Sequence, residues 1–516
     1  MKKKSLLILS TVLFLGLGVS CSSGYEYKSN AKIQITTSKE GKVYNPNEVE
    51  ILETYHSIES KRFYNTQVLP STGNVNLLVI PLLIPGYDKI DLNNDEQDDK
   101  EQVLKDIKKT FFGSGSDKSL GYESVSSFYK KSSYGKLNLK GTVTDWFDVT
   151  LGDYDFTLST ATDIEGNDRT QQIIEAAVDW ASRQGINLKD YDNDKDGYID
   201  GVWCIYSCPN YQNGGPRPQN DLGNYWAYTQ WGNQGIEGDP NSEPIYNLYG
   251  WASYDFMYEG YGFDSLDAHT YIHETGHFLG LSDYYSDSLT YNPVGKVDMM
   301  DGNMIDHNSY SKMLLGWTKP YIVTGSTTLD LYSMENENCL IVIPSDDYDG
   351  GKQFDPFSEY ILLELYSNDG LNEKDSKIQL PSRPLAMNSK GVRIYHIDNR
   401  KFVLSGETIE EYQEQPINSD NRLVLPITNS LNANQYNYYF GLDVDYNLFD
   451  EIRLIEANGT DSFRQGGKQT ERSLFKKDDV FTLAKYKDFF FNNDGEKATL
   501  NNNKTWSYEV KIKEIN

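Results

Sequence analysis

The stretch from His273 to Asp283 constrains this chain more than any other segment, because it fixes a local structure and a chemistry together. It reads His-Glu-Thr-Gly-His-Phe-Leu-Gly-Leu-Ser-Asp. On a helix, residues four apart lie on one face, so His273 and His277 can reach the same zinc ion. Glu274 points to the same cleft, where it can act as general base on a water. Gly280 permits a sharp exit from the helix, which can bring Asp283 back as the third ligand.

This HExxHxxGxxD pattern resembles the zinc signature of metzincin-type peptidases. The residues around it are similar to the immune inhibitor A family of secreted bacterial metallopeptidases. The likeness extends to six further segments, at residues 128–129, 133–137, 298–302, 312–317, 359–364 and 394–398. The resemblance implies that His273, His277 and Asp283 are zinc ligands and that Glu274 is the catalytic base. It also implies that Met300, in preference to Met299, packs beneath the zinc in a methionine turn.

Three further residues near the motif have weaker signals. Tyr310 is a candidate donor to a tetrahedral oxyanion, as tyrosines are in some metzincins, with packing on the following helix as the alternative. His269 precedes His273 by one helical turn, and a packing or hydrogen-bonding role is the simpler expectation. His307 follows the methionine turn and is a candidate for the cleft wall.

A second motif lies at residues 192–200, which read Asp-Asn-Asp-Lys-Asp-Gly-Tyr-Ile-Asp. Oxygen donors at alternate positions, with Gly197 at the sixth, resemble the first half of an EF-hand loop. The twelfth position is Trp203 instead of Glu, so the motif is not a complete EF-hand. We expect a structural calcium site, with an acidic turn as the alternative. Its ligands would be the side chains of Asp192, Asp194, Asp196 and Asp200 and the backbone carbonyl of Tyr198.

Periodicity divides the rest of the chain. Helical spacing of apolar residues alternates with buried strands as far as Trp317, and short β-rich runs follow to the C-terminus. We expect an α+β fold with a metzincin-like zinc peptidase catalytic domain over residues 73–320 and an all-β domain over 321–516. Residues 22–72 are interpreted as an N-terminal extension or short pro-segment. Residues 210–265, rich in Gly, Asn, Tyr and Trp, are expected to form loops that shape the cleft.

The first 21 residues are typical of an export signal. Lysines at positions 2–4 precede an apolar run over 6–18, which is too short to span a bilayer. Small residues before Cys21 resemble the lipobox of bacterial lipoproteins, which predicts that Cys21 is lipidated. Ordinary secretion with nearby cleavage is the alternative. Either way, the protein is expected outside the cytoplasm, at the bacterial cell surface or membrane, and possible release is left open.

The charge composition excludes one class of partner. With 48 Lys and Arg against 76 Asp and Glu, the net charge is −28, which argues against nucleic acid as a partner. The sequence therefore predicts an exported zinc metalloendopeptidase that acts on proteins or peptides. One alternative is a calcium-stabilised surface binding or adhesion protein with a non-catalytic zinc site. Another is a zinc hydrolase of non-peptide amides in the cell wall.

Overall fold

The computed structural model describes most of the chain, and all structural statements below concern these parts. They are residues 29–48, 68–149, 169–215, 225–232, 237–261, 265–286, 291–337, 339–348, 357–405, 408–411, 424–426, 429, 450–490 and 499–516. The predicted signal segment with Cys21 lies outside them, as do residues 22–28 and 49–67 of the predicted extension. None of the described helices has the length and apolar character needed to cross a membrane.

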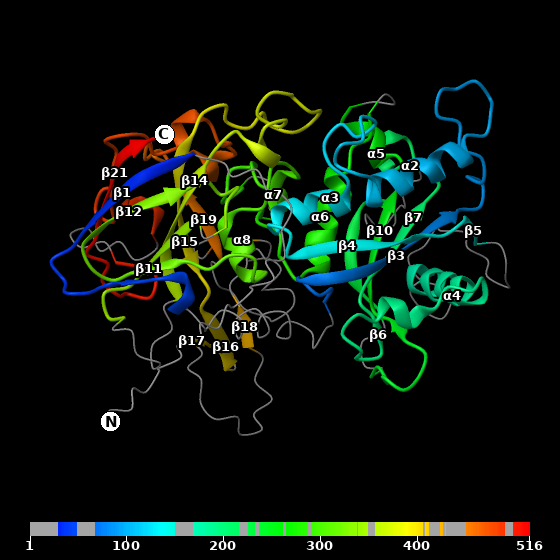
Figure 1. Cartoon of the computed structure of the whole chain (residues 1–516), viewed down its shortest axis with the longest axis horizontal. Helices are drawn as coiled ribbons and strands as arrows, with labels where there is room; N and C mark the ends of the chain where they lie inside the picture. Colours follow the sequence, from blue (N-terminus) through cyan, green and yellow to red (C-terminus); the bar gives the residue numbers. More distant parts are fainter. Residues whose placement is uncertain are drawn as a thin grey trace, which may run out of the picture.

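A mixed sheet with the strand order β4-β3-β7-β10-β8 organises the first large unit, shown on the right of Figure 1. Neighbouring strands from β4 to β10 run parallel, whereas β8 pairs antiparallel with β10 at the edge. The strands are β3 (Gly73–Leu83), β4 (Leu137–Val143), β5 (Phe147–Asp148, beside β3), β7 (Val202–Tyr206), β8 (Tyr228–Trp231) and β10 (Leu248–Ser253). A separate small pair joins β6 (Tyr198–Ile199) to β9 (Ile245–Tyr246).

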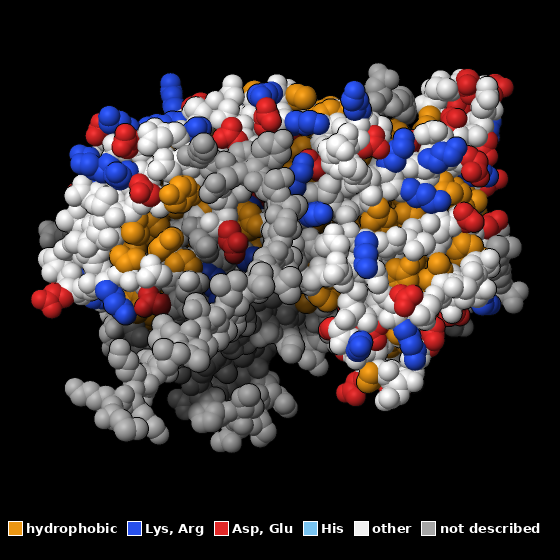
Figure 2. All heavy atoms as spheres, viewed as in Figure 1, with side chains coloured by type: hydrophobic (Ala, Val, Ile, Leu, Met, Phe, Trp, Pro, Cys, Tyr) orange, Lys and Arg blue, Asp and Glu red, His pale blue; other side chains and the backbone are white. Residues whose placement is uncertain are grey.

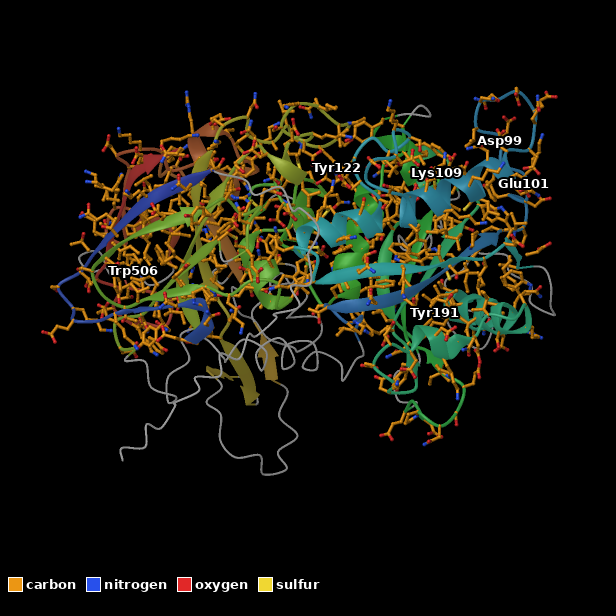
Figure 3. The ribbon with its side chains drawn as sticks, viewed as in Figure 1. Asp99, Glu101, Lys109, Tyr122, Tyr191 and Trp506 are labelled. Carbon is orange, nitrogen blue, oxygen red and sulfur yellow. The ribbon has the colours of Figure 1, made fainter. Side chains whose placement is uncertain are left out.

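Helices cover both faces of this sheet because β3 is apolar on both sides. Leu77 and Val79 face a core shared with α2, α3 and α6, whereas Leu78 and Ile80 face α4. Tyr122 and Tyr191 belong to these two cores and lie on opposite sides of the sheet in Figure 3. The helices of the unit are α2 (Lys100–Phe112), α3 (Val125–Ser132), α4 (Arg169–Arg183), α5 (Phe256–Glu259), α6 (His269–Phe278), α7 (Met299–Gly302) and α8 (Ser309–Leu314). Two short 3-10 turns are η2 (Leu188–Tyr191) and η3 (Tyr211–Asn213).

After residue 320 the described elements are strands and short 3-10 turns. A second sheet has the order β19-β15-β14-β13-β11-β2, a third the order β12-β1-β21-β20, and a small one the order β17-β16-β18. The strands are β11 (Tyr321–Val323), β12 (Thr327–Tyr332), β13 (Leu340–Pro344), β14 (Glu359–Tyr366), β15 (Gly391–Asp398), β16 (Lys401–Ser405), β17 (Thr408–Glu411), β18 (Val424–Pro426), β19 (Ile452–Ile455), β20 (Val480–Thr482) and β21 (Glu509–Ile515). The 3-10 turns are η4 (Gly370–Asn372), η6 (Ser462–Gln465), η7 (Glu471–Ser473) and η8 (Lys487–Phe489).

The N-terminal residues join these β-sheets. β1 (Asn30–Thr36) lies between β12 and β21, and β2 (Val43–Tyr44), followed by η1 (Pro46–Glu48), pairs with β11. Ala31, Ile33 and Ile35 are at most 1% exposed and belong to the apolar core between the sheets. Residues 30–36 are therefore an internal strand of the β-rich region, because they pair on both sides.

The β-rich region and the first unit share an apolar core. Leu340 and Val342 of β13 and Tyr395 of β15 belong to the same buried cluster as Met299 and Met300. Polar contacts cross the same boundary, since Glu364 Oε2 in β14 accepts a hydrogen bond from the backbone N–H of Ser309 at 2.7 Å. The first residues of α7 and of α8 are thus supported from the β-rich side (Figure 1).

The three cysteines in the described residues are free and buried. Burial raises the pKa of the Cys204 and Cys208 thiols, which disfavours the reactive thiolate. On the molecular face in Figure 2, acidic and basic side chains are interspersed.

Candidate active site

Helix α6 directs two imidazoles to one point. His273 is buried and His277 is half-buried. Their Nε2 atoms lie 3.1 and 3.2 Å from Asp283 Oδ1, respectively. One ligand atom from each of the three residues can be chosen so that all lie within 4.8 Å of one another. The structure thus brings together the three predicted zinc ligands, two from a helix and one from the loop that follows it.

Two backbone features set this geometry. Gly280 has a φ of 92°, a conformation that L side chains rarely adopt, and there the chain turns back toward the helix. His273 Nδ1 donates to the carbonyl of Met299 and His277 Nδ1 donates to the carbonyl of Leu281, both at 2.7 Å. A proton held on Nδ1 leaves the Nε2 lone pair directed at the site, as metal-binding histidines require.

The chemistry of the three donors fits a zinc ion. The contacts from both imidazoles to Asp283 lack hydrogen-bond geometry, so Asp283 Oδ1 is a buried oxygen without a donor among the described residues. Burial lowers the pKa of His277, but the Asp283 carboxylate outweighs that effect and raises it to about 9. Burial would raise the pKa of Asp283, yet the two histidines hold it well below its usual range. Two imidazoles and one carboxylate form an accepted zinc donor set with one position left open.

The predicted methionine turn lies directly under α6. A Cβ atom on Gly276 would lie 2.5 Å from Met300 Sδ, so the helix can approach this thioether only because residue 276 has no side chain. The Asp298 side chain caps α7 by accepting from the Met300 backbone N–H at 3.0 Å. Burial raises the pKa of Asp298 to about 7. Because Met299 supplies the carbonyl that orients His273, the turn also positions a candidate ligand.

Glu274 lies beside the three ligands and is 7% exposed. Thr229 Oγ1, on the edge strand β8, lies 3.1 Å from Glu274 Oε2 and 3.0 Å from the Glu274 carbonyl oxygen. Burial raises the pKa of Glu274, while His273 and His277 act in the opposite direction. Thr229 was not predicted from the sequence. The only available signal was its place in the segment 210–265, which was expected to shape the cleft.

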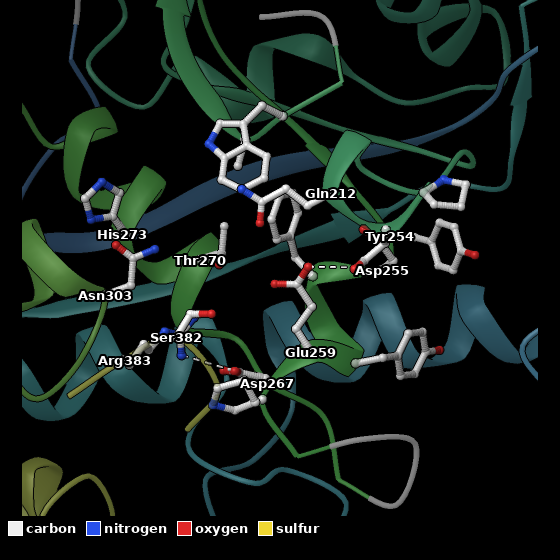
Figure 4. A pocket seen from close by; sticks show the side chains of 18 of the residues that line it. Gln212, Tyr254, Asp255, Glu259, Asp267, Thr270, His273, Asn303, Ser382 and Arg383 are labelled. Carbon is white, nitrogen blue, oxygen red and sulfur yellow. Dashed lines mark hydrogen bonds and ion pairs between the residues drawn. The ribbon is translucent and has the colours of Figure 1, made fainter. Parts of the chain in front are cut away.

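A cavity of about 820 Å³ opens at Glu274 and His273 (Figure 4). Its lining confirms that residues 210–265 shape the cleft, because Gln212, Trp226 and Asp255 are among the residues that form it. The prediction that this segment consists of loops was wrong, since it also contains β8, β9, β10 and α5, and β10 pairs on both sides within the main sheet. The β-rich region also contributes, through residues 381–383. The cavity is therefore built from both large parts of the chain.

The acidic motif at residues 192–200 forms a second cluster. One carboxylate oxygen each from Asp192, Asp194, Asp196 and Asp200 lies within 4.8 Å of the others. Asp200 is fully buried, and its Oδ1 has no hydrogen-bond donor among the described residues. Burial raises the pKa of Asp200 to about 8 and that of Asp196 to about 6, and neighbouring carboxylates add to both shifts. Tyr198 belongs to the same turn, where its backbone N–H donates to Asp196 at 2.9 Å.

The remaining candidates have other partners. The buried Tyr310 hydroxyl lies 2.7 Å from Asn399 Oδ1 and 2.8 Å from Glu451 Oε1, and Tyr310 does not line the cavity. Its hydroxyl is therefore directed at these acceptors instead of a substrate oxyanion. His269 is paired with two carboxylates. His307 is fully buried against the rings of Phe128, Tyr129 and Trp317, so it is not part of the cleft wall.

Comparison with known proteins agrees with this geometry. Residues 78–305 match the family model described as "Immune inhibitor A peptidase M6, catalytic domain". This segment runs from within β3 to just past α7 and contains Glu274 and both candidate metal sites. A search of curated proteins gave no significant match. Residues 78–305 are therefore similar to the catalytic domain of immune inhibitor A peptidases, which supports a peptidase activity for this part of the chain.

Proposed function

We propose that this peptidase is an exported, zinc-dependent endopeptidase that cleaves peptide bonds of extracellular proteins. One observation carries the zinc assignment. A buried carboxylate oxygen, Asp283 Oδ1, faces the Nε2 atoms of His273 and His277 at 3.1–3.2 Å without a hydrogen bond to either. A buried charged oxygen without a donor is costly, and a cation bound between these three groups would remove that cost.

The mechanism follows from the positions of the side chains. When bound, zinc supplies a Lewis acid that polarises the scissile carbonyl and makes a water acidic enough to deprotonate near neutral pH. Glu274 accepts the proton of the attacking water and later delivers it to the leaving amine. Its raised pKa suits both steps, because a general acid-base group works best when its pKa is near the working pH.

Thr229 restricts Glu274 during these steps. Its hydroxyl lies within hydrogen-bonding distance of Oε2, which leaves Oε1 as the oxygen available to the water. Because Thr229 belongs to β8 and Glu274 to α6, the carboxylate orientation depends on how the helix packs against the edge of the sheet. A positioned base avoids the loss of rotational freedom that a mobile side chain would undergo in the transition state.

Calcium binding and export complete the proposal. The four carboxylates at residues 192–200, with the backbone carbonyl of Tyr198, would hold a structural calcium between η2 and β7, since hard oxygen donors suit this ion. The charged start, apolar run and Cys21 support export as a lipoprotein held at the membrane by its N-terminal lipid. A Cys21→Ser substitution should move the protein from the membrane fraction to the soluble extracytoplasmic fraction.

Cleavage mapping on a peptide library, with fragments identified by mass spectrometry, tests the function. We expect internal cleavage by the wild type and loss of cleavage with 1,10-phenanthroline, restored by added zinc. Glu274→Ala should lower kcat by about 10²–10⁴-fold, the usual contribution of a general base, while it keeps zinc and its melting temperature.

Three results would contradict the proposal. Cleavage that persists after zinc has been removed would exclude a zinc mechanism. Full activity of Glu274→Ala would exclude the assigned base. Release of peptidoglycan fragments without cleavage of any peptide would indicate a hydrolase of cell-wall amides.

A further inference from the structure

The cavity at Glu274 has an unusual charge balance. Six carboxylate residues line it, and Arg383 is the only lysine or arginine among its described lining residues. The six are Asp91, Asp255, Glu259, Asp267, Glu274 and Asp301. A concave site lined by one sign of charge concentrates the field and attracts groups of the opposite sign.

The Arg383 charge is already compensated. Its Nη1 donates to Asp267 Oδ2 at 3.2 Å, and the Arg383 side chain is 14% exposed. Figure 4 shows this pair below Thr270 in the view. The excess negative charge of the cavity is therefore not neutralised by Arg383.

Asp255 and Glu259 form the uncompensated part of the wall. Asp255 is the N-cap residue of α5 and Glu259 is its last residue, and their described donors are neutral amides. Asn213 Nδ2 donates to Asp255 Oδ2 at 3.0 Å and to Glu259 Oε1 at 2.9 Å, and Asn210 contacts both carboxylates in the same way. Glu259 Oε2 has no donor among the described residues. Burial and the nearby Asp255 charge raise the pKa of Glu259, while the hydrogen bonds from Asn210 and Asn213 and the more distant Arg383 charge act in the opposite direction.

A second observation points to a ligand in the same space. Thr270 is 7% exposed and lines the cavity one helical turn before Glu274. Its hydroxyl has no hydrogen-bond partner among the described residues. In Figure 4, Thr270 lies between His273 on one side and Asp255 and Glu259 on the other. The hydroxyl is not among the fully buried polar atoms, so it is open to the cavity and available to a ligand that extends from the catalytic base to the acidic wall.

We propose that Asp255 and Glu259 form a specificity subsite for a lysine or arginine side chain of the substrate, close to the scissile bond. This inference rests on the proposed peptidase function of the same cavity. Lysine and arginine carry their charge at the end of a long apolar stem. Trp226 and Phe256, whose ring centroids are 5.3 Å apart, line the cavity and offer an apolar surface to such a stem. The carboxylates would then bind the charged end.

The test compares matched peptides that differ by lysine or glutamine at one position, chosen from the cleavage map. We expect wild-type kcat/KM to be at least about tenfold higher for the lysine peptide, as a charge-assisted hydrogen bond would give. Glu259→Gln should lower kcat/KM about tenfold for the lysine peptide and less than twofold for the glutamine peptide. Glu373→Gln, on an exposed pair with Lys377 outside the cavity, is the matched control and should change neither value.

Binding separates this inference from the proposed mechanism. Peptide affinity is measured by fluorescence anisotropy in the Glu274→Ala background, with and without Glu259→Gln. Preferential binding of the lysine peptide that disappears with Glu259→Gln supports the subsite even if no cleavage is found. Equal affinity for both peptides, or an equal loss for both on Glu259→Gln with an unchanged melting temperature, would overturn it. Cleavage without any preference for basic residues would overturn the subsite alone and leave the peptidase mechanism intact.

Discussion

Two successive turns of helix α6 use buried histidines in opposite ways. At the first turn, His269 has both ring nitrogens next to carboxylates, with Nδ1 2.6 Å from Asp267 and Nε2 3.3 Å from Asp375. One turn later, His273 donates from Nδ1 to a carbonyl, and its Nε2 approaches Asp283 without hydrogen-bond geometry. The side chains are 0% and 4% exposed, respectively, and both have acidic neighbours.

The partner of each nitrogen explains the difference. An imidazole between two carboxylates holds a proton on each nitrogen, so it is a cation and has no lone pair for a metal. An imidazole that donates to a carbonyl keeps the opposite nitrogen free as a ligand. Burial and acidic neighbours alone therefore do not identify a metal-binding histidine.

His277→Ala gives the largest effect expected from this comparison. It removes one of the three zinc donors. Substitution of a residue that only orients a donor lowers metal affinity by about 10–100-fold, so loss of a donor itself should lower zinc affinity further. Peptidase activity should fall with the zinc content. Elemental analysis and isothermal titration with zinc provide the measurements, and circular dichroism checks the fold. If the variant retained one equivalent of zinc with wild-type affinity, His277 would not be a zinc ligand.

The sequence predicted the site residues that lie close together along the chain, but not those that tertiary packing brings to the site. His273, His277 and Asp283 lie within eleven residues, so helix geometry and one glycine turn were enough to place them. Residues 31–35 alternate apolar and polar side chains in the sequence, and this alternation matches the buried and outward sides of β1. In contrast, the partners of β1 are β12 and β21, almost 300 and 480 residues away, and no local pattern specifies them.

Thr229 and Asp375 illustrate the same limit at the level of single side chains. Thr229 reaches Glu274 because β8 pairs antiparallel with β10 and lies beside α6. Asp375 reaches His269 from the β-rich region, 106 residues further along the chain. Each contact depends on tertiary packing, so the sequence could suggest that loops shape the cleft but not which residues touch the helix.

His269→Gln tests the structural end of α6 and should lower stability without loss of zinc. Burial lowers the pKa of His269, but Asp267 and Asp375 outweigh it and raise the pKa above 6.5. Because the folded state holds this proton more tightly, the stabilisation is complete below about pH 6.5 and is lost as pH rises through the folded pKa. Breaking a buried pair costs about 3–5 kcal/mol, so the gap between variant and wild type should be largest at pH 6 and narrow toward pH 9.

Thermal melting of both proteins between pH 6 and pH 9, with zinc content measured at each pH, gives the answer. Loss of zinc in His269→Gln would show that His269 also supports the metal site, contrary to the purely structural role assigned to it. If the difference in melting temperature between wild type and His269→Gln increased with rising pH, His269 would not be the cation that we infer.

Asp200→Asn extends the comparison to a cluster without imidazole, where the expected role is stability and not catalysis. At a calcium concentration of 100 Kd, binding should stabilise the wild type by about 2.7 kcal/mol, or roughly 5–10 °C for a domain of this size. The variant should lose this gain. Without calcium it should melt no lower than the wild type, because it removes a buried carboxylate whose Oδ1 has no donor and whose pKa burial raises to about 8.

The matched control for this variant is Asp179→Asn on α4, whose side chain is 71% exposed and which should leave the calcium response unchanged. Melting curves with excess calcium and with a calcium chelator, each at constant zinc, separate the two metals. Calcium that stabilises wild type and Asp200→Asn equally would show that the ion binds elsewhere. If the variant instead lost its zinc and kept its calcium response, the division between an imidazole site for catalysis and an oxygen site for stability would be wrong, because the buried carboxylate would then serve the catalytic centre.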